Sequence, residues 1–284
     1  MKEIKEKNAV EKSTLYLVAT PIGNMSDISE RAVKVLSSVD FIAAEDTRNT
    51  GLLLSRLGIR SEMVSYHDHN KEEKGRLIIE RIKNGESCAV VTDAGTPGIS
   101  DPGEDLVKLA ADNSVNVFSI PGACAAITAL TVSALPAGRF CFEGFLPSDN
   151  KKRKKRISEI KAEKRTVVLY EAPHRLIKTL SELFSALGDR RVALCREMTK
   201  LNEETIRTTL SEAIGIFSEK EPRGEFVLVI EGGSDSEKDY PEDVREHVDS
   251  LIESGLSKMD AIKAAAKERG VPKSAVYDEY NNLS

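Results

Sequence analysis

The chain has little of what marks several classes of protein. Tryptophan is absent, aromatic residues make up 5% of the sequence, and the four cysteines form no CxxC pair. No apolar run approaches the roughly 20 residues that a membrane-spanning helix needs, because the longest, residues 124–135, lies between Pro121 and Pro136. These absences argue against a disulfide-stapled domain, a cysteine-based zinc site and a membrane protein.

Neither sign of charge dominates. The 284 residues include 41 Lys+Arg and 46 Asp+Glu, a net charge of −5, which excludes a uniformly basic nucleic-acid coat protein but allows local basic patches. Residues 1–13 are charged throughout and lack the apolar core of a signal peptide. We interpret them as a solvated leader and expect a cytoplasmic protein with reduced, buried thiols.

Apolar, β-branched runs alternate with amphipathic segments from residue 14 to residue 232. Strands are predicted at residues 15–19, 41–44, 88–92, 116–120, 140–145, 166–170, 191–195 and 226–230. Helices predicted between them include residues 30–36, 74–83, 104–111 and 176–187. This alternation predicts the α/β class with largely parallel sheets.

Two changes in composition predict domain limits. Residues 151–165 carry nine basic and two acidic side chains, so we divide an N-terminal domain, 14–147, from a second domain, 148–233. Residues 234–239 are typical of a flexible linker. Residues 240–284 then form a small helical extension, with helices predicted at 244–252, 258–267 and 273–280, that only loosely resembles the helix-turn-helix class.

Loops rich in Gly and Pro follow three predicted strands, at residues 20–23, 93–98 and 121–122. Ligands of open α/β sheets bind at the carboxyl ends of strands, so we expect these loops to line one site. The second loop matches neither the P-loop nor the dinucleotide fingerprint. A turn-rich connection without a ligand is the alternative for this loop, and close helix–sheet packing is the alternative for the small residues 123–129.

Polar side chains cluster at the other strand ends. Four titratable residues beside the expected cleft are candidate general bases: Asp46, Glu171, His174 and Glu197. Ion pairs with neighbouring arginines are an equally open role for them. No metal is expected, because His67 and His69 have no third ligand at a recognisable spacing.

Eight segments together resemble a known family: TPIGNMSDISERA (20–32), AAEDTRNTGLLL (43–54), SYHDHN (65–70), TDAGTPGISDPG (92–103), FEGFLP (142–147), YEAPHR (170–175), REMTKLNEE (196–204) and RGEFVLVIEGG (223–233). In this order they closely resemble the small-subunit ribosomal RNA cytidine ribose 2'-O-methyltransferases, a family of the tetrapyrrole methylase superfamily. The resemblance covers about residues 14–233. Met25, where Leu is common, and Cys195, where Ala is usual, are minor departures.

The resemblance implies S-adenosylmethionine as methyl donor, bound in a cleft between two α/β domains of the tetrapyrrole methylase type, and a homodimer. It also implies a cytidine in the decoding region of 16S ribosomal RNA, in the small ribosomal subunit, as substrate. On this basis we expect twelve residues around the cofactor: Pro21, Ile22, Gly23, Asp93, Gly95, Thr96, Gly98, Ile99, Ala123, Cys124, Tyr170 and Cys195.

Methyl transfer from a sulfonium needs neither a metal nor a covalent nucleophile, and alignment supplies up to ~7–11 kcal/mol. A base beside the 2'-hydroxyl typically adds ~10²–10⁴-fold. Ten basic residues are expected to contact RNA: Arg48, Lys151, Lys152, Arg153, Lys154, Lys155, Arg156, Arg175, Arg196 and Lys200. A solvated helix start is the alternative for residues 151–156. Residues 256–275 are net +3, which suits a second RNA contact, a dimer contact or packing equally.

Two other functions compete with this interpretation. A tetrapyrrole C-methyltransferase would share the fold, but a small anionic substrate needs neither the basic run at residues 151–156 nor the appended helices. A non-catalytic nucleic-acid-binding protein would leave the polar clusters at the strand ends without a role. Cofactor binding distinguishes this second alternative from an enzyme.

Overall fold

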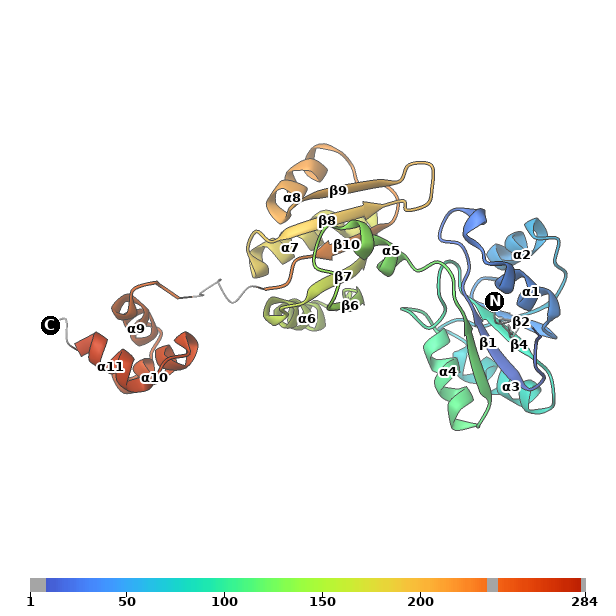
Figure 1. The fold of residues 1–284 in the computed structure, drawn as a ribbon, viewed down its shortest axis with the longest axis horizontal. Helices are drawn as coiled ribbons and strands as arrows, with labels where there is room; N and C mark the ends of the chain where they lie inside the picture. Colours follow the sequence, from blue (N-terminus) through green and yellow to red (C-terminus); the bar gives the residue numbers. More distant parts are fainter. Residues whose placement is uncertain (1–8, 234–239, 282–284) are drawn as a thin grey trace, which may run out of the picture. The chain divides into compact units, whose positions relative to one another are not determined.

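A computed structural model describes residues 9–233 and 240–281 (Figure 1). The chain divides after Gly232 into two compact units. The larger unit holds two five-stranded sheets and the smaller one holds three helices. The predicted linker, residues 234–239, and residues 1–8 of the predicted leader lie outside the described residues.

The first sheet is entirely parallel, in the order β3-β2-β4-β1-β5. Its strands are β1 (Thr14–Val18), β2 (Phe41–Ala44), β3 (Glu62–Ser65), β4 (Cys88–Val91) and β5 (Asn116–Ile120). In β1, β2 and β4 every residue is buried, as expected for parallel strands that helices cover on both faces. All five carboxyl ends therefore lie at one edge of the sheet.

Helices pack on both faces of this sheet. Two of them, α1 (Glu30–Ser38) and α2 (Thr47–Arg56), pack on one core with Tyr16 and Val18. The other two, α3 (Lys71–Lys83) and α4 (Gly103–Asp112), pack on a second core with Leu15 and Leu17. Alternate residues of β1 thus face opposite cores, as strand geometry requires. A short 3-10 turn, η1 (Met25–Asp27), precedes α1.

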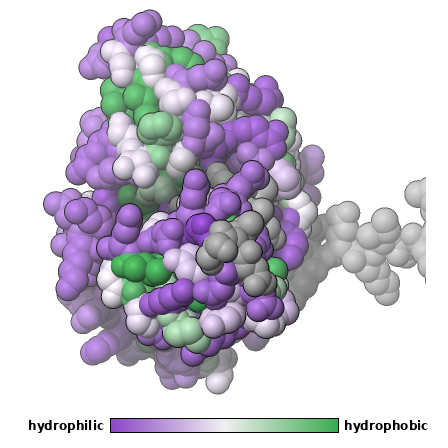
Figure 2. Space-filling model, turned by 90° about the vertical axis from the view of Figure 1, so that its left-hand side faces the viewer, coloured by the Kyte–Doolittle hydropathy of each residue, from purple (hydrophilic) through white to green (hydrophobic). Residues whose placement is uncertain are grey.

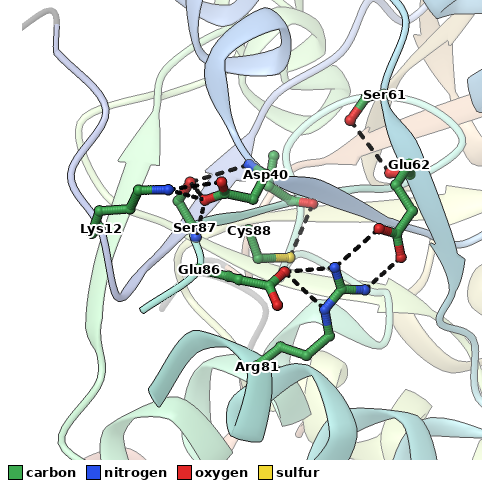
Figure 3. A network of polar contacts seen from close by, with 9 residues as sticks. Lys12, Asp40, Ser61, Glu62, Arg81, Glu86, Ser87 and Cys88 are labelled. Atoms are coloured by element: carbon green, nitrogen blue, oxygen red, sulfur yellow. Dashed lines mark hydrogen bonds and ion pairs between the residues drawn. The ribbon is translucent and has the colours of Figure 1, made fainter. Parts of the chain in front are cut away.

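A polar network lies at the opposite, amino-terminal edge of the first sheet (Figure 3). Arg81 donates to Glu62 and to Glu86, each at 2.6 Å, and its guanidinium lies 3.8 Å from the centre of the Phe41 ring. A second group there centres on Asp40, which accepts hydrogen bonds from Lys12 Nζ at 2.8 Å and from Ser87 N at 2.7 Å (Figure 3). These contacts join the residues that precede β2 and β4.

The predicted leader is only partly solvated where it is described. Val10 packs against the first core, and Lys12 is held by Asp40. Lys12 itself remains largely exposed. Residues 10–12 therefore belong to the edge of the folded unit, which corrects the expected solvated leader at that point.

The second sheet is mixed, in the order β6-β7-β10-β8-β9. Its strands are β6 (Phe140–Phe145), β7 (Thr166–Glu171), β8 (Arg191–Arg196), β9 (Glu204–Thr209) and β10 (Phe226–Ile230). Only β6 and β7 pair in parallel; β10 runs antiparallel to β7 and β8, and β8 runs antiparallel to β9. The expectation of largely parallel sheets is confirmed for the first sheet and wrong here. The short loop 197–203 permits only an antiparallel β8–β9 pair, and β10 runs antiparallel to both of its neighbours.

The change between sheets lies earlier in the chain than predicted. Since β6 pairs with β7, the change falls between Ile120 and Phe140 rather than near residue 147. Between these strands, α5 (Ala125–Val132) packs Ala126, Ala129 and Leu130 on one face of the second sheet. The packing alternative thus accounts for the small residues of α5, which begins two residues later than expected.

The opposite face of the second sheet is covered by α6 (Asn150–Ala162), α7 (Leu176–Leu187) and α8 (Leu210–Glu219), which form its main core. A 3-10 turn, η2 (Pro173–Arg175), leads into α7. On the face of the molecule drawn in Figure 2, the described residues are mostly hydrophilic and apolar side chains gather in small patches.

The smaller unit confirms the predicted three helices as α9 (Val244–Glu253), α10 (Lys258–Arg269) and α11 (Lys273–Asn281). It has a core of its own, built from Val244, Val248, Val276 and four residues of α10. His247 is buried in this unit, where its ring stacks on Tyr240 and its Nε2 lies 2.8 Å from Glu268.

Candidate functional site

A cavity of about 540 Å³ lies at the carboxyl ends of strands from both sheets of the larger unit and at the amino end of the antiparallel strand β10. Its volume is within the range of small-molecule sites, ~300–1,000 Å³. Its lining comprises Ile22, Glu45, residues 92–96 and 99–101, Cys124, Ala125, Phe145, residues 170–174, Glu197, Met198, Lys200 and residues 225–227. Segments far apart in the sequence therefore build one site.

Two of the three predicted loops meet at this cavity. Thr20 and Gly95 exchange backbone hydrogen bonds, with N···O distances of 2.9 and 3.1 Å. Thr96 Oγ1 donates to the carbonyl oxygen of Ala123 at 2.9 Å. The first two loops line the cavity, as expected, whereas residues 121–122 do not and only the following Cys124 and Ala125 do. The ligand of these loops stays a prediction.

Asp101 organises the longest of these loops. Its carboxylate accepts hydrogen bonds from the backbone N–H groups of Gly98 at 2.8 Å, Ile99 at 3.2 Å and Gly103 at 2.7 Å. Ser100 adopts a φ of 65°, a conformation uncommon outside glycine. Asp101 lines the cavity and was missed as a site residue, although an aspartate before Pro-Gly is a recognisable turn signal.

Gly144 permits the second sheet to approach this loop. It lies at the irregularity in the β6–β7 pairing and has a φ of 61°. A Cβ at this position would lie 2.6 Å from Ser100 Oγ. Only glycine therefore fits both the backbone conformation and the space.

Tyr170 forms part of the wall from the second sheet. Its ring makes edge contacts with Phe142 and Phe145, and its hydroxyl accepts a hydrogen bond from Ala126 N at 3.2 Å. Burial raises the pKa of Tyr170 to about 12. The phenol is therefore neutral at physiological pH. Its ring gives the cavity an apolar wall, and its hydroxyl already has a hydrogen-bond partner.

Glu45 is a cavity carboxylate that the sequence analysis did not select. It follows β2, and its Oε2 accepts a hydrogen bond from Asp93 N at 3.3 Å. Burial, together with the nearby charges of Asp93 and Asp101, raises the pKa of Glu45. Its place directly after a buried strand was the available signal, although the adjacent Asp46 was the candidate expected from the sequence.

Asp46 lies outside the cavity lining and has a structural partner. It caps α2 by accepting from Arg48 N at 2.8 Å, and its side chain pairs with the Arg48 guanidinium at 2.6 Å. The hydrogen bonds from Arg48 lower the pKa of Asp46 to about 2. The ion-pair alternative therefore describes this residue.

The other three candidate bases line the cavity but differ in their surroundings. Glu171 is buried and accepts from Thr179 Oγ1 at 2.5 Å. Glu197 accepts from Lys200 Nζ at 3.0 Å and from a backbone N–H at 3.1 Å; burial acts to raise its pKa, but these bonds lower it overall. His174 is exposed at the cavity.

Of the twelve predicted cofactor contacts, seven line the cavity: Ile22, Asp93, Gly95, Thr96, Ile99, Cys124 and Tyr170. The five that do not are Pro21, Gly23, Gly98, Ala123 and Cys195. For Cys195 this is a correction, because the thiol is fully buried in β8 beneath α5 and burial raises its pKa. Among the cysteines, Cys88 is also buried, whereas Cys124 and Cys141 are only half-buried, and all four are free thiols.

The basic run at residues 151–156 forms the first turns of α6, after the capping residue Asp149. Lys151, Lys152, Lys154 and Lys155 are exposed. Arg153 is only 3% exposed and donates to Glu182 at 2.5 Å and to Thr179 at 2.7 Å. The prediction that Arg153 contacts RNA is therefore corrected: its guanidinium is a core group.

The remaining predicted RNA contacts also carry partners. Arg156 pairs with Glu143 at 2.6 Å, Arg196 pairs with Glu204 at 2.9 Å, and Arg175 donates to the carbonyl oxygen of Leu146 at 2.6 Å. Only Lys200 of the predicted set lines the cavity, where it bonds Glu197 and Glu225. Arg48 is highly exposed beside Asp46.

The described part of the chain comprises residues 9–233 and 240–281. Within these ranges, no group of three or more His, Cys, Asp or Glu lies where it could hold a metal ion. Nor is any helix of the same ranges both long enough and apolar enough to cross a membrane.

Residues 14–214 match the tetrapyrrole (corrin/porphyrin) methylases, over a span that includes most of the cavity lining. The chain belongs to the tetrapyrrole methylase family. The resemblance on which the sequence analysis relied is thereby confirmed at the level of the family, and so is the predicted fold class.

Curated relatives match this tetrapyrrole methylase over nearly its full length. A protein of Bacillus subtilis named ribosomal RNA small subunit methyltransferase I is 48% identical over 94% of each chain. A protein of the same name from Escherichia coli O157:H7 is 44% identical over 93% of each chain.

Solved structures share the fold at low sequence identity. Uroporphyrin-III-C-methyltransferase from Thermus thermophilus superimposes with a TM-score of 0.56 at 18% identity, over 77% of this chain and 94% of that one. A diphthine synthase gives a TM-score of 0.59 at 15% identity, over 77% and 90%. A further structure of the Thermus thermophilus enzyme, complexed with S-adenosylhomocysteine, gives a TM-score of 0.54 at 18% identity, over 77% and 97%.

Proposed function

We propose that this protein transfers a methyl group from S-adenosylmethionine to the ribose 2'-hydroxyl of a cytidine in the 16S RNA of the small ribosomal subunit. The observation that carries the proposal is the cavity itself: seven of the eight motif segments of the family resemblance contribute to its lining. Relatives that share 42–48% identity over nearly the whole chain carry the name of a small-subunit ribosomal RNA methyltransferase.

The cavity suits a cationic, hydrogen-bonding cofactor. Other carboxylates besides Glu45 line it, Asp93 and Asp101 from the side of the first sheet and Glu171, Glu197 and Glu225 from the second, which favours a positively charged ligand. The hydroxyl of Thr92 is buried at the cavity without a hydrogen-bond partner among the described residues, so a ligand atom can satisfy it. Bound S-adenosylmethionine would supply an electrophilic methyl group there.

The chain's own residues hold and align the reactants. We assign the methionine and ribose portions of the cofactor to the backbone of Ile22 and of residues 93–96 and 99, and the adenosine to the region of Cys124 and Tyr170. The rigid loop around Asp101 fixes that backbone before any ligand binds. Alignment of this kind is the main contribution that a direct methyl transfer requires.

We further propose Glu45 as the proton acceptor for the 2'-hydroxyl. Its Oε2 accepts one long hydrogen bond, whereas Glu171 and Glu197 each accept shorter ones from neighbouring side chains. Its raised pKa brings it closer to neutrality, where a general base is most effective. His174 is the competing candidate because it is exposed at the same cavity.

The Glu45→Gln variant tests this assignment. We expect kcat to fall by ~10²-fold or more, since the amide cannot accept the proton, with the Kd for S-adenosylmethionine changed less than threefold. His174→Gln is the matched control, and we expect it to retain kcat. A loss of kcat in His174→Gln alone would transfer the role to the histidine, and a loss of cofactor affinity in Glu45→Gln would make Glu45 a binding residue.

We assign RNA contacts to Lys151, Lys152, Lys154 and Lys155 at the start of α6. They are exposed, and α6 begins five residues after Phe145, which lines the cavity. Phosphates that flank a bound cytidine would therefore lie within reach of these long side chains. The resemblance further implies a homodimer in the cytoplasm, and sedimentation at micromolar concentration measures the first of these.

Methyl transfer to isolated subunits tests the function as a whole. Small subunits from cells that lack this protein would be incubated with labelled S-adenosylmethionine, and the labelled nucleotide mapped with nucleases. Label at one cytidine that resists alkaline cleavage is the expected result. Cofactor binding without label on the subunits, but with label on a tetrapyrrole, would assign the chain to the C-methyltransferases instead.

A further inference from the structure

Charge is segregated within the smaller unit. Residues 240–255, which include α9, carry one arginine and five acidic residues, a net charge of −4. Residues 256–275, which include α10 and the start of α11, carry five basic and two acidic residues, a net charge of +3. In a chain with a total charge of −5, this segment is a local exception.

The basic residues of this segment fall into two groups. Arg269 and Lys258 are occupied within the unit. Arg269 donates to His247 Nδ1 at 3.1 Å and to the carbonyl oxygen of Pro241 at 2.6 Å, and Lys258 donates to Asn281 Oδ1 at 2.9 Å. Lys263, Lys267 and Lys273 are exposed and have no ion pair or side-chain hydrogen bond among the described residues. Three charges are therefore available to a partner.

The local fold holds these lysines on helices. Lys263 and Lys267 are four residues apart on α10, so they lie on one face, and the buried Ala261, Ile262 and Ala265 occupy the other. At the end of α10, Gly270 has a φ of 66° and the Val271 N–H bonds the carbonyl oxygen of Ala266, the pattern of a Schellman motif.

The turn after α10 brings a further polar and aromatic pair to the surface. Residues 270–272 join the helices, and α11 begins directly with Lys273. Tyr277, one turn later on the same side of α11, is 44% exposed. We define Lys263, Lys267, Lys273 and Tyr277 as the lysine face.

We propose that the lysine face binds the sugar–phosphate backbone of a helical segment of the ribosomal RNA substrate. This inference rests on the proposed function, since it takes the partner from the same substrate. The structure offers three exposed ammonium groups and one exposed aromatic ring on two consecutive helices, a set suited to phosphates and sugars. Lysine is depleted at protein–protein interfaces, which argues for a nucleic acid over a second copy of the chain.

The residues of the lysine face are separate from those of the cofactor site. All of the cavity lining comes from residues 22–227, and the smaller unit has its own core. Loss of the lysine face should therefore weaken substrate binding and leave cofactor binding and the chemical step intact. A packing role for residues 256–275 would instead make its effect appear as lost stability of the unit.

A triple variant of the full-length chain, K263E/K267E/K273E, tests the proposal. We expect KM for small subunits to rise roughly tenfold or more, with kcat and the Kd for S-adenosylmethionine unchanged. The slope of log affinity against log salt should fall by about 2–3, one unit or slightly less for each lost phosphate contact. The corresponding lysine-to-glutamine variant should show a smaller rise in KM.

The matched control, K34E/K108E/K220E, reverses three exposed lysines on the larger unit and changes the net charge equally. An equal rise in KM for both variants, or none for the first, overturns the proposal while the function stands. Absence of methyl transfer by the unaltered protein counts against the proposed function instead. In that case, filter binding of the unaltered protein and the triple variant to a ribosomal RNA stem still tests whether the lysine face binds RNA. If the triple variant loses as much affinity for a DNA duplex of the same length, the lysine face is a general phosphate contact.

Discussion

At the scale of single residues, the site depends on a glycine position where a Cβ atom would not fit. Gly144 and Ser100 both have positive φ, and a Cβ on Gly144 would overlap the Ser100 hydroxyl. The loop that Asp101 holds together is therefore positioned from two directions, by its own carboxylate and by the neighbouring strand. These contacts therefore determine the shape of this part of the cavity wall.

We predict that Gly144→Ala lowers the free energy of unfolding by about 1–3 kcal/mol, from the strained φ and the overlap together. Affinity for S-adenosylmethionine should fall as well, because the loop must shift. Gly215→Ala is the control, since that helical glycine has no neighbour within 4 Å of a new Cβ and alanine favours helices. Urea unfolding and calorimetric titration measure the two effects.

At the scale of elements, the polar network at the amino-terminal edge of the first sheet stabilises the strands from the side opposite the cavity. Asp40 accepts hydrogen bonds from Lys12 and Ser87, and these bonds, led by that from Lys12, lower the pKa of Asp40 to about 2. They link the leader to the starts of β2 and β4.

This pKa shift makes a contribution to stability that depends on pH. The folded pKa is below the ordinary 3.8, so the contribution is complete above about pH 4–5 and is lost as the pH falls toward 2. We predict that Asp40→Asn destabilises the protein by ~1 kcal/mol at pH 7. Its difference from the unaltered protein should shrink steadily below pH 4 in thermal unfolding scans. An equal difference at pH 7 and pH 2.5 would contradict the assignment.

Strands rich in apolar residues were predictable, and polar edge strands were not. The strands β2, β5, β6 and β10 match their predicted bounds: β2 and β10 are uninterrupted apolar runs, and apolar or aromatic residues predominate in β5 and β6. The edge strands β3 and β9 were missed: β9 reads Glu-Thr-Ile-Arg-Thr-Thr, with one apolar residue, since neither of its faces is fully buried. Pairing direction was equally invisible, because it depends on how the chain returns after β8.

The candidate site shows the same limit. Loops after strands were placed correctly because parallel strands end at one edge, whereas the partner of each side chain was not predictable. Arg153 looks in sequence like its exposed neighbours but falls on the buried face of α6 with Ile157 and Ile160. Glu45 and Asp46 are adjacent, yet only the first faces the cavity.

At the scale of the whole molecule, the two units should respond differently to the cofactor. The cavity draws its lining from both sheets, so binding stabilises the larger unit as one body. We predict that S-adenosylhomocysteine at 100 times its Kd raises the free energy of unfolding of this unit by ~2.7 kcal/mol. The unfolding temperature of the helices in residues 240–281 should not change. Scanning calorimetry separates the unfolding transitions of the two units. A chain that ends at Gly233 should keep the transition of the larger unit and its shift with the cofactor product.

The separation of the two edges of the first sheet has a practical consequence. Lys12 is mostly exposed at the edge that holds the Arg81 and Asp40 network (Figure 3). Every residue of the cavity lies beyond the other ends of these strands or belongs to the second sheet and its connections. A dye, a solid support or a cross-linker attached near Lys12 would therefore leave the entrance of the cavity clear. The amino-terminal edge is the place from which to tether this protein for measurements on single ribosomal particles.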